Sequence, residues 1–174
     1  MIYMVEMGFS APGLRAEWDA WYLSHMKMLI TIPGIRATQR FEALTAHLQP
    51  FVALHEVDGP EVFESAAYRA KAGPASTGEW QARHTSWKRN VLAGLENTPD
   101  VPMDGFLLIA EEGAEGGLPA GIAVHRVEAV GLDRSVTRRF IAVADQPSAA
   151  DQAIGKPGIR VLKPLTPRLR AAAA

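Results

Sequence analysis

The amino-acid sequence predicts an α+β fold, and three observations lead to it. Residues 1–97 present strand-like and helix-like segments in the order β-α-β-β-α-β. Short motifs from this stretch return, in the same order, in the rest of the chain. The returning copy has no residues suited to a first long helix. Because β-α-β-β-α-β is the order of a ferredoxin-like unit, we predict tandem ferredoxin-like repeats that form one α+β barrel, the second repeat lacking its first helix.

Local patterns define the first three elements. Residues 1–10 are apolar and β-leaning until Pro12-Gly13 interrupts them, which predicts a strand. Over residues 14–32, apolar and aromatic side chains recur at three- and four-residue steps, which is typical of an amphipathic helix, and Pro33-Gly34 ends it. Residues 35–44 alternate between apolar and polar side chains and form the second predicted strand.

The rest of the first repeat contains two strands and a helix. Residues 51–57, which end at the turn Asp58-Gly59-Pro60, form the third predicted strand. A second helix runs from residue 60 to about Gly73-Pro74. A fourth strand is predicted over residues 90–95, and the stretch before it, residues 79–89, is either a short helix or an ordered loop.

Echoes of the first repeat define the second one. Three pairs of segments correspond: residues 51–54 with 140–143, 40–44 with 126–130, and 91–92 with 161–162. The glycine-rich segment 112–119 stands where the first helix of the copy would lie, and we predict a loop there. Residues 1–100 are therefore assigned to the first repeat and 101–170 to the degenerate second repeat, packed together as one structural unit. The closing run Ala171–Ala174, a natural tail or a cloning scar, is set aside.

Composition excludes several classes of function. The chain has 174 residues, 48% of them hydrophobic, and a formal net charge of -1. It therefore lacks the basic surface that would bind nucleic acids or anionic membranes. No apolar run approaches the roughly 18 residues of a membrane span, and the start of the chain does not resemble a signal peptide, so a cytoplasmic location is expected. Cysteine is absent, which excludes disulfides and a cysteine nucleophile.

The first helix and the segment after it carry a distinctive pattern: Trp18-x-x-Trp21-Tyr22-x-x-His25, then Pro33-Gly34, then Arg40-Phe41. This pattern resembles the dimeric α+β barrel superfamily, and within it the EthD-like branch. It departs from the branch at Ser24, where an acidic residue is common, and in lacking a proline just after the histidine. The superfamily includes isomerases, cyclases, monooxygenases and haem enzymes, so the resemblance does not select a reaction. A homodimer is expected on general grounds, although the internal repeat permits a monomer.

His25 is the leading candidate for chemistry. It shares one helix face with Trp21 and Tyr22, so it is expected to point at the sheet, where an imidazole is a natural acid or base. The competing interpretation is a buried structural histidine. We predict a cavity between the helix and the sheet, lined by Met28, Arg40 and these aromatic residues, with His25 as the base and Tyr22 as a hydroxyl donor.

Neighbouring strands supply further candidates. Arg40 or His55 would stabilise a developing oxyanion, because a guanidinium can hold an enolate or carboxylate in a bidentate manner. The alternatives are a structural ion pair of Arg40 with Glu42 or Glu56, and a satisfied core histidine at position 55, paired with Glu6 or Arg40. Glu6 is either a substrate-binding carboxylate with a raised pKa or an exposed residue at the rim of the sheet.

The segment 79–90 is rich in aromatic and basic residues. Trp80, His84 and Trp87 are candidates for substrate binding, with the tryptophans beside an aromatic ligand and His84 as a second proton carrier. A plain packing role for the tryptophans is an equal alternative.

Together these features predict a cofactor-independent acid–base enzyme, an isomerase, cyclase or lyase, that acts on a small aromatic or polyketide-like molecule. Two alternatives stay open: a non-catalytic small-ligand-binding or assembly module, and a cofactor-free monooxygenase. No metal or cofactor is expected, because the sequence has no HExxH, GxSxG or phosphate-loop motif. A haem held by one histidine also stays open.

Overall fold

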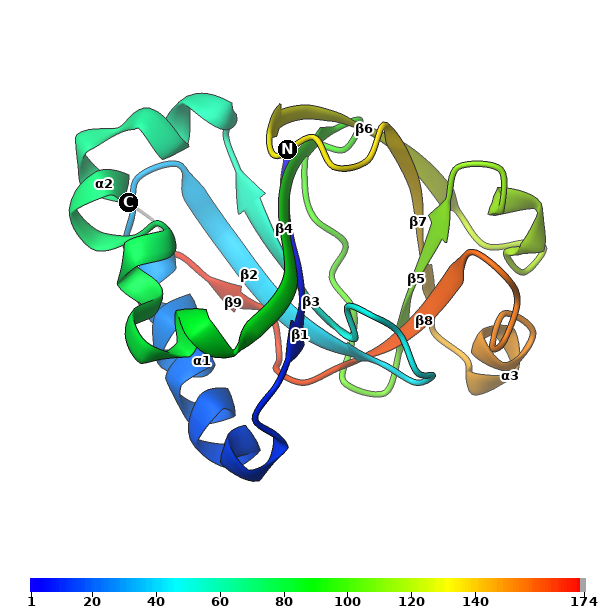
Figure 1. Cartoon of the computed structure of the whole chain (residues 1–174). Coiled ribbons are helices and arrows are strands. Elements are labelled where there is room, and N and C mark those ends of the chain that lie inside the picture. The colour runs from blue at the N-terminus through cyan, green and yellow to red at the C-terminus, as the bar shows by residue number, and fades with distance from the viewer. Residues whose placement is uncertain (173–174) are drawn as a thin grey trace.

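The computed structural model describes residues 1–172, apart from the side chains of residues 74 and 75, so the last two alanines lie outside the described residues. Eight strands close into one antiparallel barrel (Figure 1). The first half contributes β1 (Ile2–Phe9), β2 (Ile35–Ala43), β3 (Phe51–Val57) and β4 (His84–Ala93). The second half contributes β5 (Phe106–Glu111), β6 (Val124–Leu132), β7 (Arg138–Ala144) and β8 (Ile159–Pro164).

Strand order shows that the two halves are built alike. The spatial order is β2-β3-β1-β4 in the first half and β6-β7-β5-β8 in the second, which is the same ferredoxin-like arrangement twice. The echoing sequence segments fall on matching strands: β3 with β7, β2 with β6, and β4 with β8. Strand β4 pairs with β6, and β2 pairs with β8 and the short β9 (Leu169–Arg170), so the outer edges of the two sheets are joined. The predicted α+β barrel is confirmed.

Apolar side chains from both halves fill the barrel. Alternate residues of β1 and β3 point inward and meet alternate residues of β5, β7 and β8 from the second half. The buried members of this core are Ile2, Met4, Phe41, Val52, Leu54, Leu92, Val101, Leu107, Ile109, Val127, Ile141 and Leu162. Each half therefore covers the sheet face that the other would leave exposed, and this explains how one chain closes the barrel.

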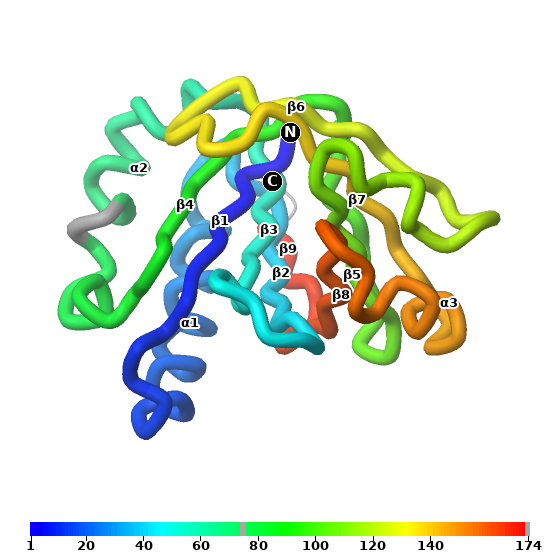
Figure 2. The backbone as a smooth tube through the Cα atoms, turned by 45° about the vertical axis from the view of Figure 1, so that its right-hand side comes forward, coloured from blue at the N-terminus to red at the C-terminus, as the bar shows by residue number. Residues whose placement is uncertain are grey.

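Helices cover the outer faces of the barrel. After a short 3-10 turn, η1 (Pro12–Leu14), helix α1 (Arg15–Leu29) packs against the outside of the first half. The predicted second helix is divided into η2 (Pro60–Glu64) and α2 (Ala66–Lys71), because Ser65 takes an extended conformation and caps α2 by accepting a hydrogen bond from the Tyr68 N–H. Figure 2 shows α1 and α2 on the first half and α3 (Pro147–Asp151) on the second.

The loop between β5 and β6 and the start of β4 bear on two of the sequence predictions. Within the described residues, the second half has no long helix between β5 and β6, where only the 3-10 turn η4 (Glu115–Gly117) stands, as predicted. The start of the fourth strand was predicted wrongly: β4 begins at His84, after the 3-10 segment η3 (Pro74–Arg83). Residues 84–89 look irregular in sequence because a bulge at Ser86 interrupts their alternation, but the residues on either side of the bulge pair with β1.

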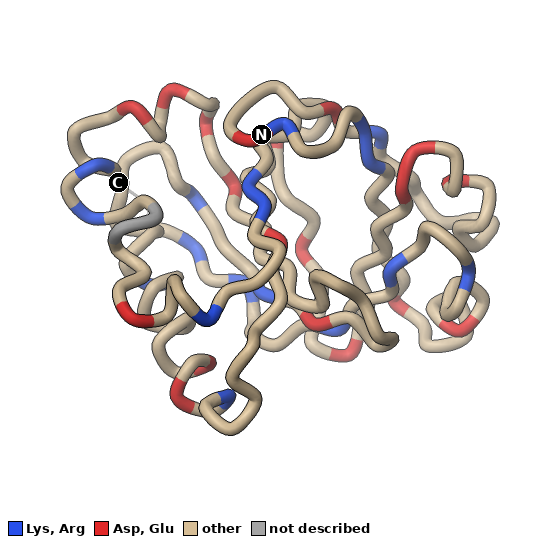
Figure 3. Tube along the Cα trace, viewed as in Figure 1, with Lys and Arg blue, Asp and Glu red and all other residues tan. Residues whose placement is uncertain are grey.

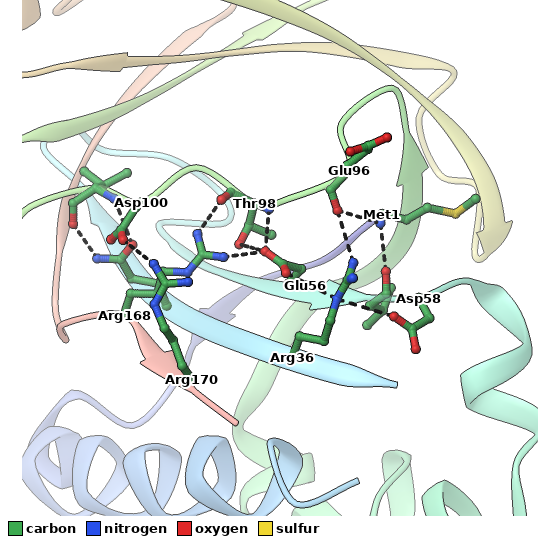
Figure 4. Close-up of polar contacts among 12 residues, drawn as sticks. Met1, Arg36, Glu56, Asp58, Glu96, Thr98, Asp100, Arg168 and Arg170 are labelled. Carbon is green, nitrogen blue, oxygen red and sulfur yellow. Dashed lines mark hydrogen bonds and ion pairs between the residues drawn. The ribbon is translucent and has the colours of Figure 1, made fainter. Parts of the chain in front are cut away.

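Buried ion pairs join distant parts of the chain. Glu56 on β3 accepts hydrogen bonds from Arg168 and, at 3.0 Å, from the Thr98 N–H, so it ties the β4–β5 linker to the C-terminal segment (Figure 4). Arg36 lies 3.3 Å from the other oxygen of Glu56.

Elsewhere acidic and basic residues are scattered over both halves (Figure 3). In residues 1–172, no helix has the length and apolar character needed to cross a membrane.

Candidate active site

A cavity of about 30 Å³ lies between α1, the outer face of the first half and the α2–η3 segment. Aromatic and apolar side chains dominate its wall, which is typical of small-molecule sites. The lining residues are Tyr3, Val5 and Met7 of β1, Trp21, Tyr22, His25 and Leu29 of α1, His55 of β3, Tyr68, Gly73 and Thr77 of the covering segment, and His84, Trp87 and Arg89 of β4.

His25 enters the cavity from α1. Its ring stacks on that of Trp21, with centroids 5.1 Å apart and an interplanar angle of 18°. It makes no hydrogen bond to any residue that the structure describes. Burial lowers the pKa of His25 to about 4, so its imidazole is neutral at pH 7 and free to accept a proton.

His55 faces the same cavity from β3. Its Nδ1 lies 2.7 Å from the Oγ1 of Thr38, and its ring lies 5.0 Å from that of Tyr3. Burial, and then the charge of a protonated His25, lower the pKa of His55 to about 3. The predicted pairing with Glu6 or Arg40 is wrong, because Thr38 on the adjacent strand β2 lies directly opposite His55 in the register of the sheet.

His84 reaches the cavity from the first position of β4. The Nε1–H of Trp18 donates to its Nε2 at 3.0 Å. Burial, with smaller effects of Arg40 and His25, lowers the pKa of His84 to about 4. The remaining ring nitrogen, Nδ1, is buried without a hydrogen-bond partner among residues 1–172, and the same is true of Nε1 of Trp87.

Arg40 does not line the cavity, which corrects the sequence prediction. Its side chain is buried between α1 and the sheet, where Nη1 donates to Oδ1 of Asp19 at 2.6 Å. The guanidinium carbon lies 4.1 Å from the ring centroid of Trp18 and 4.2 Å from that of Tyr22. The ion-pair partner is thus Asp19 rather than Glu42 or Glu56, and Arg40 fixes α1 to the sheet behind the cavity.

Glu6 also lies away from the cavity, inside the barrel. It is fully buried and pairs with Arg160 and Arg139 of the second half. Burial alone would raise the pKa of Glu6, but the two guanidinium groups outweigh it and lower the pKa, opposite to the prediction. The prediction failed because strand alternation places Glu6 on the barrel face, beside Met4, while Tyr3 faces the helix.

Met28 and Trp80 are likewise absent from the lining; both pack against the apolar core between α1 and the sheet. Sequence reasoning missed Tyr3, Tyr68 and Arg89 as lining residues. The alternation of β1 could have identified Tyr3, since Tyr3, Val5 and Met7 share one face. No comparable sequence signal marks Tyr68, because its position depends on how the covering segment folds back.

Arg89 is the charged member of the described lining. Its Nη2 lies 3.3 Å from Oδ1 of Asp133, and its guanidinium carbon lies 5.5 Å from the ring centroid of Trp87. An open groove of about 300 Å³ shares Arg89, Tyr68 and Gly73 with the cavity. The cavity and this groove are therefore adjacent.

The described residues contain no group of three or more His, Asp or Glu side chains placed to hold a metal ion. As it stands, the cavity of about 30 Å³ accommodates only water-sized molecules, so neither a haem nor an organic substrate fits unless the α2–η3 segment moves.

Comparisons with known proteins address the fold. No protein-family model matches the chain, and no curated protein matches it. A solved structure of a candidate monooxygenase from Lactobacillus acidophilus is similar, with a TM-score of 0.58 and 12% identity over 99% of this chain and 97% of that one. An anthrone oxidase-like protein gives a TM-score of 0.59 at 9% identity, over 99% of this chain and 93% of that one.

A candidate chlorite dismutase is also similar, with a TM-score of 0.55 and 11% identity over 95% of each chain. At such low identities the likeness shows the fold and leaves chemistry open. The closer resemblance to the EthD-like branch stays a prediction. The strand order, the repeat and these neighbours together show that the chain has the fold of the dimeric α+β barrel superfamily, with both ferredoxin-like halves in one chain.

Proposed function

We propose that the chain is a cofactor-independent acid–base enzyme that acts on a small aromatic or polyketide-like molecule in the His25 cavity. The observation that carries this proposal is the convergence of three neutral imidazoles, those of His25, His55 and His84, on one aromatic-walled cavity. Buried titratable groups with perturbed pKa values, gathered in a cavity, are characteristic of catalytic sites.

His25 is the proposed base. Its low pKa reflects the free energy needed to create an isolated positive charge in a buried site. When His25 takes a proton from the substrate, a substrate anion forms at the same time, so the cavity gains no net charge and much of that penalty is offset. Burial raises the pKa of Tyr22 to about 12, so its hydroxyl keeps its proton and can donate a hydrogen bond to the substrate.

A substrate enters only if the covering segment moves. The cavity of about 30 Å³ holds little more than water, whereas a cavity of roughly 150 Å³ accommodates benzene. The α2–η3 segment is the natural moving part, because it supplies Tyr68, Gly73 and Thr77 to the wall of the cavity and also lines the larger groove. Its closure over the substrate would exclude water from the proton transfer.

A second candidate is a cofactor-free monooxygenase. It is favoured by the shared fold of solved structures named as a candidate monooxygenase and an anthrone oxidase-like protein, each over 99% of this chain. Both reactions begin with the same proton transfer to His25. They diverge afterwards: the substrate anion is protonated at another atom in an isomerisation or cyclisation, or it gives electrons to dioxygen in an oxygenation.

The test begins with thermal shifts across a panel of aromatic acids and polyketide-like phenols. With a compound that binds and reacts, His25→Ala is expected to lower turnover by about 100- to 10,000-fold while barely changing the melting temperature. His125→Ala, an exposed histidine on β6 outside the cavity, is the control and should keep full turnover. An oxygen electrode separates the two candidate reactions. If no compound binds the wild type and His25→Ala melts well below it, His25 is structural and the proposal fails.

A further inference from the structure

Two ring nitrogens of residues that line the cavity are buried without hydrogen-bond partners among the described residues. They are Nδ1 of His84 and Nε1 of Trp87, whose rings lie 5.5 Å apart at an angle of 64°. Each buried polar group without a hydrogen-bond partner destabilises the folded protein. Native proteins leave few such groups, and two beside each other in one cavity call for an explanation.

The chemistry of Trp18 makes His84 a donor. An indole N–H can only donate, so the Nε2 of His84, 3.0 Å from Nε1 of Trp18, must be the accepting, unprotonated nitrogen. The proton of the neutral imidazole therefore resides on Nδ1. Both Nδ1–H of His84 and Nε1–H of Trp87 are thus donors, and neither can accept a hydrogen bond from a ligand.

A β-bulge places the two donor side chains on the same face of the sheet. Residues three apart on a regular strand point to opposite faces of the sheet. The pairing of β1 with β4 shifts by one residue between Glu6 and Gly8, so His84 and Trp87 both face the cavity. Ser86 takes a φ of 48°, uncommon for a non-glycine residue, and the buried amide of Gln49 holds it by donating to the Ser86 carbonyl oxygen at 2.7 Å.

From these observations we infer that His84 Nδ1–H and Trp87 Nε1–H form a two-donor site for one ligand oxygen, a carbonyl oxygen that becomes an enolate or phenolate. The inference deepens the proposed function and rests on it for the role of the cavity in catalysis. The charges around the cavity favour a negatively charged ligand oxygen, because Arg89 lines the cavity and none of the described residues that line it is a carboxylate.

The site defines a substrate class: a small ring compound with a ketone or phenol oxygen next to an acidic C–H or O–H bond. His25 takes the proton, forming an N–H bond. The electron pair of a broken C–H bond becomes the C=C bond of the enolate while the carbonyl π pair moves onto the oxygen, and in a phenol the pair of the broken O–H bond stays on the oxygen. That oxygen keeps the negative charge between the two N–H donors. Donors fixed in advance on a rigid strand stabilise such a charge without reorganising.

The experiment uses 4-nitrophenol as a probe, because its phenolate absorbs visible light and needs no turnover. The wild type is expected to bind the phenolate in preference to the phenol, which lowers the apparent pKa of the bound probe. Trp87→Phe keeps an aromatic ring but removes the N–H, and it should weaken phenolate binding by about 10- to 100-fold. Binding of 4-nitroanisole, which has no ionisable oxygen, should change by less than about threefold. His125→Ala, at an exposed position on β6 outside the lining, should leave both affinities unaltered.

A second measurement is independent of ligand binding. The ¹⁵N chemical shifts of His84 should show the proton on Nδ1 from pH 5 to 8 in the wild type. The inference is overturned by a proton on Nε2, by a wild type that binds no 4-nitrophenolate, or by a Trp87→Phe affinity within about twofold of wild type. His25→Ala separates the two proposals, because this variant should still bind the phenolate. If it binds the phenolate and also keeps full turnover, His25 is not the base, but the two-donor oxygen site still stands.

Discussion

Glu6→Gln tests how the two halves of the barrel are held together. Glu6 is fully buried on β1, and its Oε1 pairs with Arg160 on β8 and, at 3.5 Å, with Arg139 on β7. The substitution keeps the shape of the side chain but removes its charge. Arg160 then loses its carboxylate partner in a buried position, while Arg139 keeps its ion pair with Glu111.

The expected loss is large. Removing one member of a buried ion pair lowers the free energy of unfolding by about 3–5 kcal/mol, because the remaining charge stays buried and uncompensated. For a domain of this size each kcal/mol corresponds to roughly 2–4 °C in melting temperature, so a fall of about 6–20 °C follows. A matched exposed carboxylate is available in Glu128, which pairs with Arg126 and Arg138 at the surface. Glu128→Gln should change the stability by less than about 0.5 kcal/mol.

Urea unfolding followed by tryptophan fluorescence measures both variants, with unchanged slopes showing that the same surface is exposed. The wild type should also lose stability below about pH 4.5 as Glu6, whose pKa is lowered in the folded state, becomes protonated, and Glu6→Gln should lack this component. A loss under about 1 kcal/mol, or one equal to that of Glu128→Gln, would refute the view that this cluster joins the halves.

Three further predictions concern the first half and its junction with the second. The pKa of His55 is about 3 in the folded protein, below its value in the unfolded chain, so the unfolded state binds more protons at acidic pH. The melting temperature should therefore fall as the pH is lowered from about 6.5 towards 4. His55→Gln should make this fall less steep, and an unchanged slope would contradict the assignment. Arg40→Lys should lower the free energy of unfolding by about 1–3 kcal/mol without a specific loss of turnover, because lysine cannot stack on the rings of Trp18 and Tyr22. A large fall in turnover at unchanged stability would show instead that Arg40 acts in the active site. Gly113→Ala, at positive φ but in open space, should lower the free energy of unfolding by only the backbone cost of about 1–3 kcal/mol. Gly94→Ala should lower it by more, because φ is 117° there and a Cβ would also lie 2.4 Å from the Arg126 carbonyl oxygen. Equal losses in the two glycine variants would show that the contact between β4 and β6 is not tight.

The sequence by itself determined the class of fold and its repetition. Period-two and period-3.6 patterns, interrupted by proline and glycine, are local properties of the chain, and they placed β1, α1, β2 and β3 within a few residues of their bounds. The echoes between residues 40–92 and 126–162 placed equivalent strands in both halves. The face of α1 that carries His25 also followed from helical spacing alone, and this face lines the cavity.

Tertiary structure alone decided which polar groups meet. Glu6 lies 133 and 154 residues from Arg139 and Arg160, and no periodicity reports a contact across such a separation. Because of the bulge at Ser86, His84 and Trp87 lie on the same face of the sheet, whereas the alternation of a regular strand would place them on opposite faces. Local patterns determine which side of an element is apolar. The closure of the barrel determines what lies opposite that side, and so which charges are compensated and which N–H groups are left for a ligand.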